Sequence, residues 1–189
     1  MAPKDQNPNP QNTGEALQHV QAQFQKFWES PKAETEAEAR VQHVLDYFIK
    51  PSDAPDRFEI KGLREVKLVS ANPETASACF ELTVAPHLCS KFGTLHGAAA
   101  AMLLDMLTST CLSMIARPEY LDAGHVSRAL ILSYHRPIQQ GEKIRVKCRV
   151  VSIGKRMANL TGEIVTPDGK ICVSCVHDKV ILERVKVKL

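Results

Sequence analysis

The stretch from Phe92 to Asp105 constrains the fold of this 189-residue chain more than any other. It opens on a glycine and a histidine and continues as a run that is apolar on every side of a helix except at Asp105. A helix that is apolar all round is a buried helix. An ionised carboxylate in its middle is costly unless it is paired or used. We therefore predict a buried central helix over residues 95–116, with Asp105 either a functional group or a hydrogen-bonded core residue.

Strand-like sequence lies on both sides of this helix. Two runs precede it, residues 63–70 and 76–86, and four follow it, residues 125–135, 143–152, 157–166 and 170–182. In the run 143–152, apolar and charged residues alternate, as in a strand with one buried face. Strands joined by short turns form an antiparallel sheet. We predict an α+β fold in which a curved antiparallel sheet wraps around the helix, and a second subunit covers the rest of it.

The N-terminal part has a different composition. Residues 1–13 are rich in Pro, Asn and Gln and are predicted to be a disordered tail. Apolar residues then recur at helical spacing over residues 17–28, and Ser30-Pro31 begins a second helix that Lys50-Pro51 ends. We therefore divide the chain into a tail, a helical extension over residues 14–55 and a main domain over residues 56–189. The extension is expected to pack on the core or on a neighbouring subunit.

Composition disfavours several classes of partner. The net charge is only +3 and is spread along the chain, which does not indicate nucleic-acid binding. The longest uncharged run, residues 92–104, is too short to cross a bilayer, so we expect no membrane insertion. The N-terminus has no secretory apolar region, and the absence of Arg from its first 30 residues argues against a mitochondrial transit peptide. We expect a cytoplasmic protein, with a mitochondrial location left open.

Six cysteines raise the question of a metal or redox site. Cys172 and Cys175 form a C-x-x-C, but they lie in a strand-like run, where residues three apart point to opposite faces. The chain has no second C-x-x-C or histidine pair with zinc spacing. We therefore expect buried core cysteines and no metal site.

The central segment resembles a known signature. Phe92-Gly93-Thr94-Leu95-His96-Gly97, with Asp105 nine residues after the histidine, is similar to the motif of hotdog-fold acyl-CoA thioesterases, in particular the PaaI-like and thioesterase superfamily member 2 branch. Further matching segments follow, namely Val126-Ser127, Ser133–Pro137, Gly141, Gly154–Arg156 and His177. The resemblance covers roughly residues 60–182. It implies the hotdog fold and hydrolysis of an acyl-CoA thioester.

The start of the central helix suits this chemistry. Backbone N–H groups at a helix N-terminus lack intrahelical partners and carry partial positive charge. They can polarise a carbonyl and hold the oxyanion that forms on attack. Gly97 has no Cβ to prevent close approach, so we assign its N–H as the oxyanion donor. His96 would hydrogen-bond near the thioester, or alternatively bond only to a loop carbonyl.

Helix geometry separates His96 from Asp105. Nine residues place them about half a turn out of phase and roughly 13.5 Å apart along the axis. The two cannot meet around one small substrate within a chain, but they can meet across a two-fold dimer. In the resembled family the active site is shared between subunits in this way. We therefore expect a catalytic homodimer, and a dimer of dimers as the full assembly.

The resemblance assigns the remaining catalytic roles. Asp105 is the general base on water, or a nucleophile that forms a mixed anhydride. Ser127 matches a hydroxyl that helps to position the attacking water; alternatively it is a polar strand residue. Ser90 stands where the branch carries Asn and has a shorter reach. Ala98 replaces a second glycine and narrows the acyl entrance.

The substrate carries phosphates if it is a coenzyme A ester, so basic residues are expected at the site mouth. Arg136, Lys155 and Arg156 lie where related proteins bring loops to the nucleotide. The charged row within 143–149 is a weaker candidate, because such a row is usually a solvated strand face. Leu95 and Met106 are the expected contacts for the rest of the substrate. The aliphatic helix side chains are compatible with a fatty acyl group and do not exclude an aryl group.

Two other functions remain open at this point. A hotdog hydratase has a similar fold but a different histidine and acid motif, which is not found here. A non-catalytic hotdog protein that binds acyl-CoA or a protein partner is the alternative that Ser90 and Ala98 keep open. For the thioesterase, no cofactor is expected beyond the coenzyme A of the substrate itself.

Overall fold

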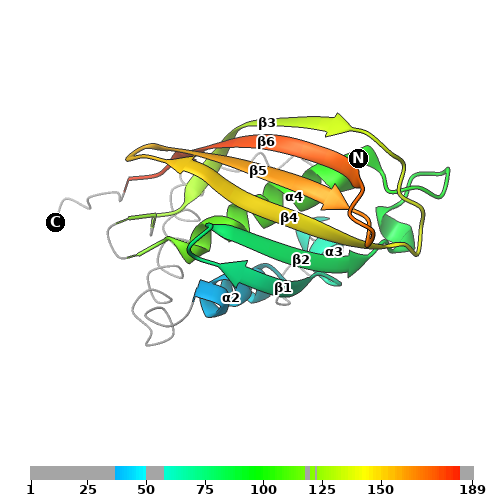
Figure 1. The fold of residues 1–189 in the computed structure, drawn as a ribbon, viewed down its shortest axis with the longest axis horizontal. Coiled ribbons are helices and arrows are strands. Elements are labelled where there is room, and N and C mark those ends of the chain that lie inside the picture. The colour runs from blue at the N-terminus through cyan, green and yellow to red at the C-terminus, as the bar shows by residue number, and fades with distance from the viewer. Residues whose placement is uncertain (1–36, 50–57, 118–119, 122, 184–189) are drawn as a thin grey trace, which may run out of the picture.

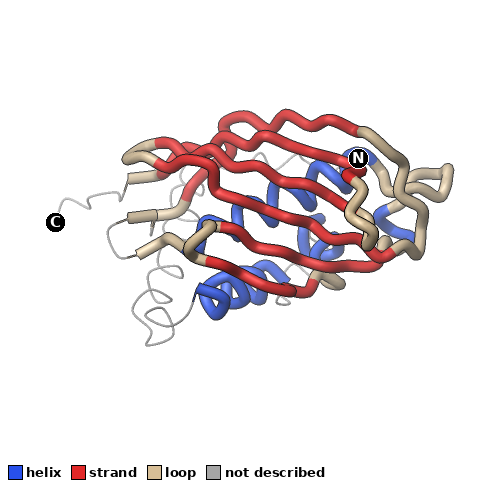
Figure 2. The backbone as a smooth tube through the Cα atoms, in the orientation of Figure 1, coloured by secondary structure: helices blue, strands red, loops and turns tan. Residues whose placement is uncertain are grey.

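The computed structural model describes residues 37–49, 58–117, 120–121 and 123–183. The predicted tail, the helix predicted over residues 17–28 and the Lys50-Pro51 helix end lie outside these residues. The described part contains a sheet with helices on one of its faces, as Figure 2 shows. The helices are α2 (Ala37–Ile49), α3 (Phe58–Leu63) and α4 (Gly97–Cys111), together with the short 3-10 turns η2 (Pro86–Leu88) and η3 (Leu112–Met114).

The sheet is antiparallel throughout and has six strands. They are β1 (Lys67–Asn72), β2 (Ser77–Thr83), β3 (His125–Tyr134), β4 (Lys143–Ile153), β5 (Met157–Val165) and β6 (Ile171–Ile181). Their order is β1-β2-β4-β5-β6-β3, so β1 and β3 are the two edges (Figure 1). The strand after the central helix therefore crosses to the far edge of the sheet. This confirms the predicted antiparallel sheet around one helix.

The core lies between α4 and the concave face of the sheet. In β4 the apolar members of the alternating run, Ile144, Val146 and Cys148, are at most 2% exposed. β5 crosses α4 closely at Gly162, where a Cβ would come within 3.0 Å of Leu104, Thr108 and Cys175. The segment 97–114 is apolar and long enough to span a bilayer, yet 67% of it is buried inside this fold. Burial against the sheet thus explains its apolar composition.

Helix α2 belongs to the same core. Its Val41 and Leu45 are fully buried and join the cluster formed by α4 and the sheet. The guanidinium of Arg40 donates to the carbonyl oxygens of Ser113 and Met114 in η3, directly after α4. The predicted apolar face of this helix is therefore confirmed over its described residues. The helix ties the N-terminal extension to the end of the central helix.

One predicted strand boundary is wrong. The run 63–70 was expected to be a strand from its start, but α3 occupies Phe58–Leu63 and β1 begins only at Lys67. The reason lies in the spacing of Ile60 and Leu63, which are three apart and both buried on one helical face. The other strands agree with the prediction to within three residues, whereas α4 ends at Cys111, five residues before the predicted helix end, and the 3-10 turn η3 follows it. Cys172 and Cys175 are both buried core residues, as expected.

Candidate active site

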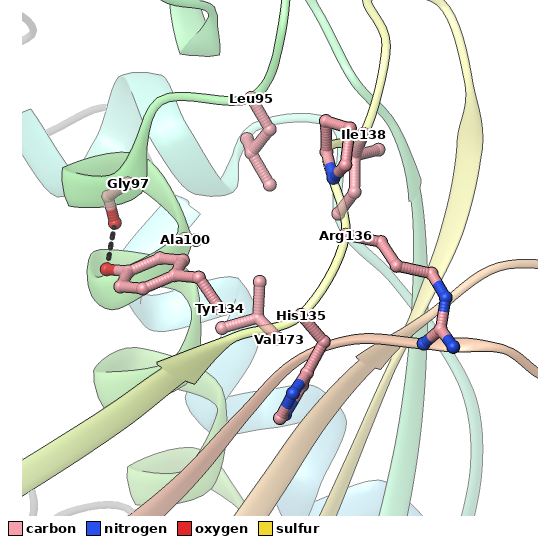
Figure 3. A pocket seen from close by; sticks show the side chains of 9 residues that line it. Leu95, Gly97, Ala100, Tyr134, His135, Arg136, Ile138 and Val173 are labelled. Carbon is pink, nitrogen blue, oxygen red and sulfur yellow. Dashed lines mark hydrogen bonds between the residues drawn. The ribbon is translucent and has the colours of Figure 1, made fainter.

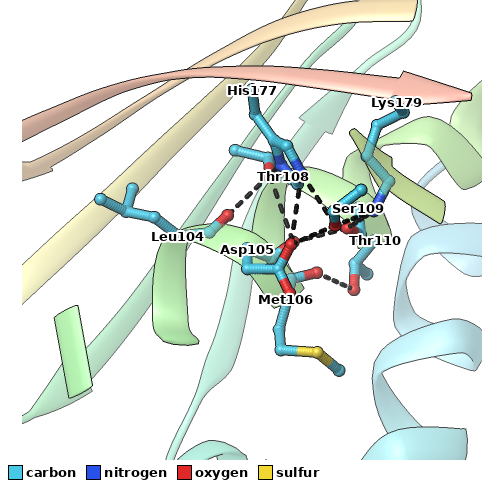
Figure 4. A network of polar contacts seen from close by, with 9 residues as sticks. Leu104, Asp105, Met106, Thr108, Ser109, Thr110, His177 and Lys179 are labelled. Atoms are coloured by element: carbon cyan, nitrogen blue, oxygen red, sulfur yellow. Dashed lines mark hydrogen bonds and ion pairs between the residues drawn. The ribbon is translucent and has the colours of Figure 1, made fainter. Parts of the chain in front are cut away.

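A polar cluster surrounds Asp105 on the face of α4 that meets β3 and β6 (Figure 4). The hydroxyl of Ser127, on β3, donates to Oδ1 of Asp105 at 2.7 Å. Nε2 of His177, on β6, lies 3.2 Å from the same oxygen and 3.0 Å from Ser127 Oγ. Both contacts of the carboxylate fall on Oδ1. Since the Asp105 side chain is 37% exposed, Oδ2 is the oxygen available to a reactant.

Lys179, two residues after His177 on β6, is the remaining member of this cluster. Its Nζ donates to Ser127 Oγ at 3.0 Å and to Ser109 Oγ at 2.7 Å. His177 and Lys179 are 0% and 3% exposed. Neither residue was assigned a role from the sequence. The sequence did contain a signal for their burial. Side chains alternate between the two faces of a strand, and both residues fall at the same alternate positions as the inward-facing Cys175 and Ile181.

The proton positions in the cluster follow from donor and acceptor capacity. An ionised carboxylate only accepts, so Nε2 of His177, 3.2 Å from Oδ1 of Asp105, carries a proton and donates it to Ser127 Oγ at 3.0 Å. Nδ1 is then an acceptor 2.7 Å from the Thr108 hydroxyl, whose single proton it shares with the Leu104 carbonyl oxygen, 2.6 Å away. A lysine ammonium only donates, so Ser127 Oγ accepts from Lys179 and sends its single proton to Asp105. Asp105 therefore accepts a hydrogen bond from the Ser127 hydroxyl, which His177 and Lys179 orient in turn.

Burial governs the charges of the neighbouring bases. It lowers the pKa of His177 to about 4, with the charge of Lys179 adding to the effect and Asp105 opposing it. Burial also lowers the pKa of Lys179 to about 8, against the attraction of Asp105. The pKa of His125, at the start of β3, is lowered to about 3 by burial and then by Lys179 and His177. At neutral pH the two histidines are thus neutral and Lys179 is a cation.

The other polar end of α4 is its N-terminus. His96 is the N-cap residue, and its Nδ1 accepts from the backbone N–H of Ala98 at 3.0 Å. Neutral His96 therefore carries its proton on Nε2, as a donor on an exposed side chain. The N–H of Gly97 has no acceptor among the described residues. The helix start thus presents one unused backbone donor beside an imidazole N–H.

Gly97 lies in a hollow of about 270 Å³ (Figure 3). Leu95, Tyr134 and Arg136 are among its lining residues, and the Tyr134 hydroxyl donates to the Gly97 carbonyl at 2.9 Å. A Cβ built at Gly97 would meet Tyr134 atoms at 3.4–3.6 Å, which is ordinary van der Waals contact. Neither this packing nor a positive φ requires a glycine here. Its missing side chain instead leaves room beside the free N–H.

A larger hollow of about 640 Å³ opens beside Asp105. Its floor is the α4 stripe that includes Ala98, Ala101 and Met106, and Ser127 lies on its β3 side. The other lining residues come from α2, α3, α4 and β3 and are mostly apolar: Phe48, Phe58, Glu59, Met102 and Leu130. Asp105 thus stands at a groove that would accommodate an apolar chain. Ala98, one of the two departures from the resembled motif, lines this groove.

Ser90 makes its hydrogen bonds within the turn in which it lies. Its hydroxyl accepts from the N–H of Phe92 at 3.2 Å and lies 3.2 Å from Thr94 Oγ1. Its backbone N–H donates to the Thr94 carbonyl at 2.7 Å. The loop that contains Ser90 leads into His96, so Ser90 is at the helix N-terminus but engaged in local bonds.

The three predicted phosphate contacts lie at two different ends of the molecule. Arg136 follows β3, lines the hollow at Gly97 and donates to the carbonyl of Ile171. Lys155 and Arg156 are exposed in the hairpin between β4 and β5, and Arg156 pairs with Glu183 at 3.4 Å. The backbone carbonyl of Arg156 accepts from Ile181, near the start of β3. One chain therefore does not bring these basic residues together.

The same division separates the catalytic candidates. His96, Gly97 and Ser90 lie at the N-terminal end of α4, whereas Asp105 and Ser127 lie roughly 13.5 Å further along the helix, by its rise over nine residues. One end of the helix thus offers a backbone donor suited to an anion, and the other end offers an oriented carboxylate. In the described part of the chain, no group of three or more His, Cys, Asp or Glu side chains is placed to hold a metal ion.

Comparison with known proteins is consistent with this geometry. Residues 92–173 match the family described as the thioesterase superfamily. Mouse acyl-coenzyme A thioesterase 13 is 30% identical over 118 residues, which are 62% of this chain and 80% of that protein. The crystal structure of zebrafish thioesterase superfamily member 2 has a TM-score of 0.66 at 23% identity, over 79% of this chain and 100% of that one. Escherichia coli PaaI, from the phenylacetic acid degradation operon, has a TM-score of 0.58 at 17% identity, over 76% and 94%.

Proposed function

This chain belongs to the thioesterase superfamily and is a thioester hydrolase, and we propose that it cleaves an acyl-coenzyme A ester at a site shared by two subunits of a homodimer. The observation that carries the proposal is the Asp105 carboxylate, fixed through Oδ1 by Ser127 and His177 and open at Oδ2 toward an apolar groove. A carboxylate so placed suits general base or nucleophilic work on a thioester carbonyl.

In the proposed reaction, Asp105 either takes a proton from the attacking water or attacks the carbonyl carbon itself. The carbonyl oxygen gains negative charge as the carbon becomes tetrahedral. The Gly97 N–H of the other subunit receives that charge, with the Nε2–H of His96 beside it. The C–S bond then breaks. On the general-base route the thiolate takes up the proton that Asp105 removed from water, and the free acid and the coenzyme A thiol leave. On the nucleophilic route the thiolate takes a proton from solvent and leaves a mixed anhydride on Asp105, which a water molecule then hydrolyses to the free acid and the carboxylate. The protein needs no cofactor of its own in this scheme.

Edge strand β3 supports the two-fold arrangement. It exposes apolar Val126 and Ile131, and its outer backbone groups have no neighbouring strand among the described residues. Such an edge favours pairing with another strand. Ser127 lies near one end of β3 and Tyr134 at the other, next to Gly97. Antiparallel pairing of two β3 strands would therefore bring the Gly97 end of one chain to the Asp105 end of its partner.

The groove at Asp105 favours an acyl group with apolar length. Methionine and leucine side chains are flexible and aliphatic, and Met102, Met106 and Leu130 line this groove. Phe48 and Phe58 also line this groove. At the other end, Arg136 would face the phosphates of coenzyme A, with Lys155 and Arg156 brought from the partner. A pairing of dimers remains part of the proposal.

The test is release of free thiol from short, medium, long and phenylacetyl coenzyme A esters, by the wild type and by Asp105→Ala. We expect turnover that the variant loses while it still binds the substrate. Asp46→Ala is the matched control, because this exposed aspartate on α2 bonds only to nearby Gln42 in the described residues. Wild-type protein inert toward all four esters, or an Asp105→Ala variant of full activity, would overturn the proposal.

A further inference from the structure

Lys179 is a cation in the interior of the fold. Its side chain is almost fully enclosed between α4, β3 and β6, with 3% of the residue exposed. Lysines are almost never fully buried unless they are paired, because a charge loses much hydration energy on burial. No carboxylate of the described residues lies within 4.0 Å of Nζ, which instead donates to two serine hydroxyls. Core packing alone gives no reason for such a residue.

The charged and titratable groups around Lys179 come from each element that packs on it. Asp105 lies on α4, and its negative charge stabilises the ammonium. His125 on β3 and His177 on β6 are both neutral at pH 7 because burial lowers the pKa of each. On β5 the paired residue is the apolar Ala158. The Asp105 carboxylate is therefore the counter-charge of Lys179, although a serine separates the two groups.

From this geometry we infer that Lys179 is a positioning residue for hydrolysis, which acts through Ser127 and not on the substrate. A protonated Lys179 can only donate to Ser127 Oγ, so the serine proton has to point at Asp105. Lys179 thereby sets which oxygen of the carboxylate is occupied and leaves Oδ2 to the reactant. This inference rests on the proposed function.

Deprotonation of Lys179 removes its control over the direction of the Ser127 proton. A neutral amine has a lone pair and accepts a hydrogen bond, so Ser127 can turn its proton from Asp105 to Nζ. The carboxylate then loses both a hydrogen bond and its buried counter-charge. Burial lowers the pKa of Lys179 to about 8, so the change falls just above neutral pH. We expect kcat to decline on the alkaline side of a midpoint near that value.

Lys179→Met is the decisive variant. Replacing a buried charge with an apolar side chain of similar volume is often neutral or stabilising, so the variant is expected to fold. We expect kcat to fall about 10- to 100-fold, as for loss of one hydrogen bond to a charged group, with KM little changed. The alkaline decline of kcat should vanish. Lys67→Met, which removes an exposed lysine at the opposite edge of the sheet, is the matched control and should keep the wild-type profile.

Two further variants separate positioning from a purely structural role. In a Ser127→Ala background, Lys179→Met should cause a much smaller loss than it does alone, because the serine through which it acts is gone and only its charge on Asp105 remains. Lys179→Arg keeps a permanent cation, so it should move the alkaline decline out of range while retaining part of the activity. This variant also provides the test if Lys179→Met does not fold. A purely structural lysine would lower stability without changing the shape of the pH profile.

The outcomes distinguish this inference from the proposed function. If the wild type hydrolyses acyl-coenzyme A esters but Lys179→Met keeps the wild-type kcat and the alkaline decline, the positioning role is overturned and the thioesterase proposal stands. Additive losses in the Lys179→Met and Ser127→Ala double variant would also overturn it. If neither the wild type nor Asp105→Ala hydrolyses any of the esters, the proposed function is overturned, and the positioning role that rests on it is overturned as well.

Discussion

Gly97 is a position at which packing and activity can be separated. A Cβ there fits against Tyr134, so Gly97→Ala should fold at least as stably as the wild type, with a gain of up to about 1 kcal/mol from helix propensity. The methyl group would occupy the space beside the free N–H, so hydrolysis should fall about tenfold or more. Urea unfolding and thiol release measure the two effects on one preparation.

Gly162→Ala is the contrasting control. The same added methyl would lie 2.8–3.0 Å from Leu104, Thr108 and Cys175, so this substitution should lower the free energy of unfolding. A Gly97→Ala protein that is as active as the wild type would show that the free N–H of Gly97 does not receive the oxyanion.

The buried histidines predict acid sensitivity. His177 and His125 have folded-state pKa values of about 4 and about 3, below the ordinary value of 6.5. As the pH falls below 6.5, the unfolded chain therefore binds protons that the folded protein does not, and stability drops. Each histidine contributes up to about 1.4 kcal/mol per pH unit until its folded-state pKa is reached.

The measurement is the free energy of unfolding in urea between pH 7.5 and pH 5. His125→Phe should flatten its dependence on pH, since none of the described residues bonds to the buried Nδ1 of this ring. His87→Gln changes an exposed histidine and should leave the slope as in the wild type. Equal stability of the wild type at both pH values would contradict the assignment of neutral buried rings.

Helix α4 and the strands could be predicted from sequence because their apolar patterns extend over many residues. The all-apolar run required a buried helix, and alternation in β4 required one buried face. The short helix α3 was not predicted, because two buried residues three positions apart are too few to distinguish a helical turn from the start of a strand. Of the site, the ends of α4 were predicted, but Lys179 was not. Its strand position is inward, yet only the fold shows that Ser127 and Ser109 lie opposite.

The two edges of the sheet should differ in their effect on assembly. Ile131 on β3 is 66% exposed and Val69 on β1 is 46% exposed. If β3 forms the dimer interface, Ile131→Glu places two charges together across the two-fold axis and should yield an inactive monomer. Val69→Glu, on the opposite edge, should remain an active dimer. Sedimentation velocity and thiol release would decide. A dimeric Ile131→Glu protein or a monomeric Val69→Glu protein would place the interface elsewhere.

The groove-lining residues of α4 should determine which lengths of acyl chain the protein accepts. Met106 lies next to Asp105 on the groove floor. Met106→Trp would fill part of the groove with a larger, stiffer side chain, so kcat/KM should fall for long acyl esters and change little for acetyl-coenzyme A. A bulky side chain in a flexible groove costs about 1–3 kcal/mol where it clashes, which corresponds to roughly 10- to 100-fold. Equal losses for all chain lengths would mean that the acyl chain lies elsewhere.

Under the proposed function, the whole molecule holds two half-sites at opposite ends of one helix. Each has features that its own chain does not use: the free Gly97 N–H at one end, the open Oδ2 of Asp105 at the other. Because β3 runs beside α4 in the opposite direction, a two-fold axis through this strand would place unlike ends together. An assembly of this kind makes one rigid helix serve two sites. It also makes folding of the single chain insufficient for activity.

Hybrid dimers test this arrangement directly. Gly97→Ala damages only the N-terminal end of α4 and Asp105→Ala only the other end, so each homodimer contains two defective sites. In a hybrid of the two chains, one site combines an intact Gly97 with an intact Asp105 and the other site carries both defects. Random exchange of equal amounts makes half of the dimers hybrid, so roughly one quarter of the wild-type sites should be restored. Two affinity tags would isolate the hybrids, and thiol release would measure their rate. If each site were built within one chain, every site in the mixture would keep one defect and no activity would return.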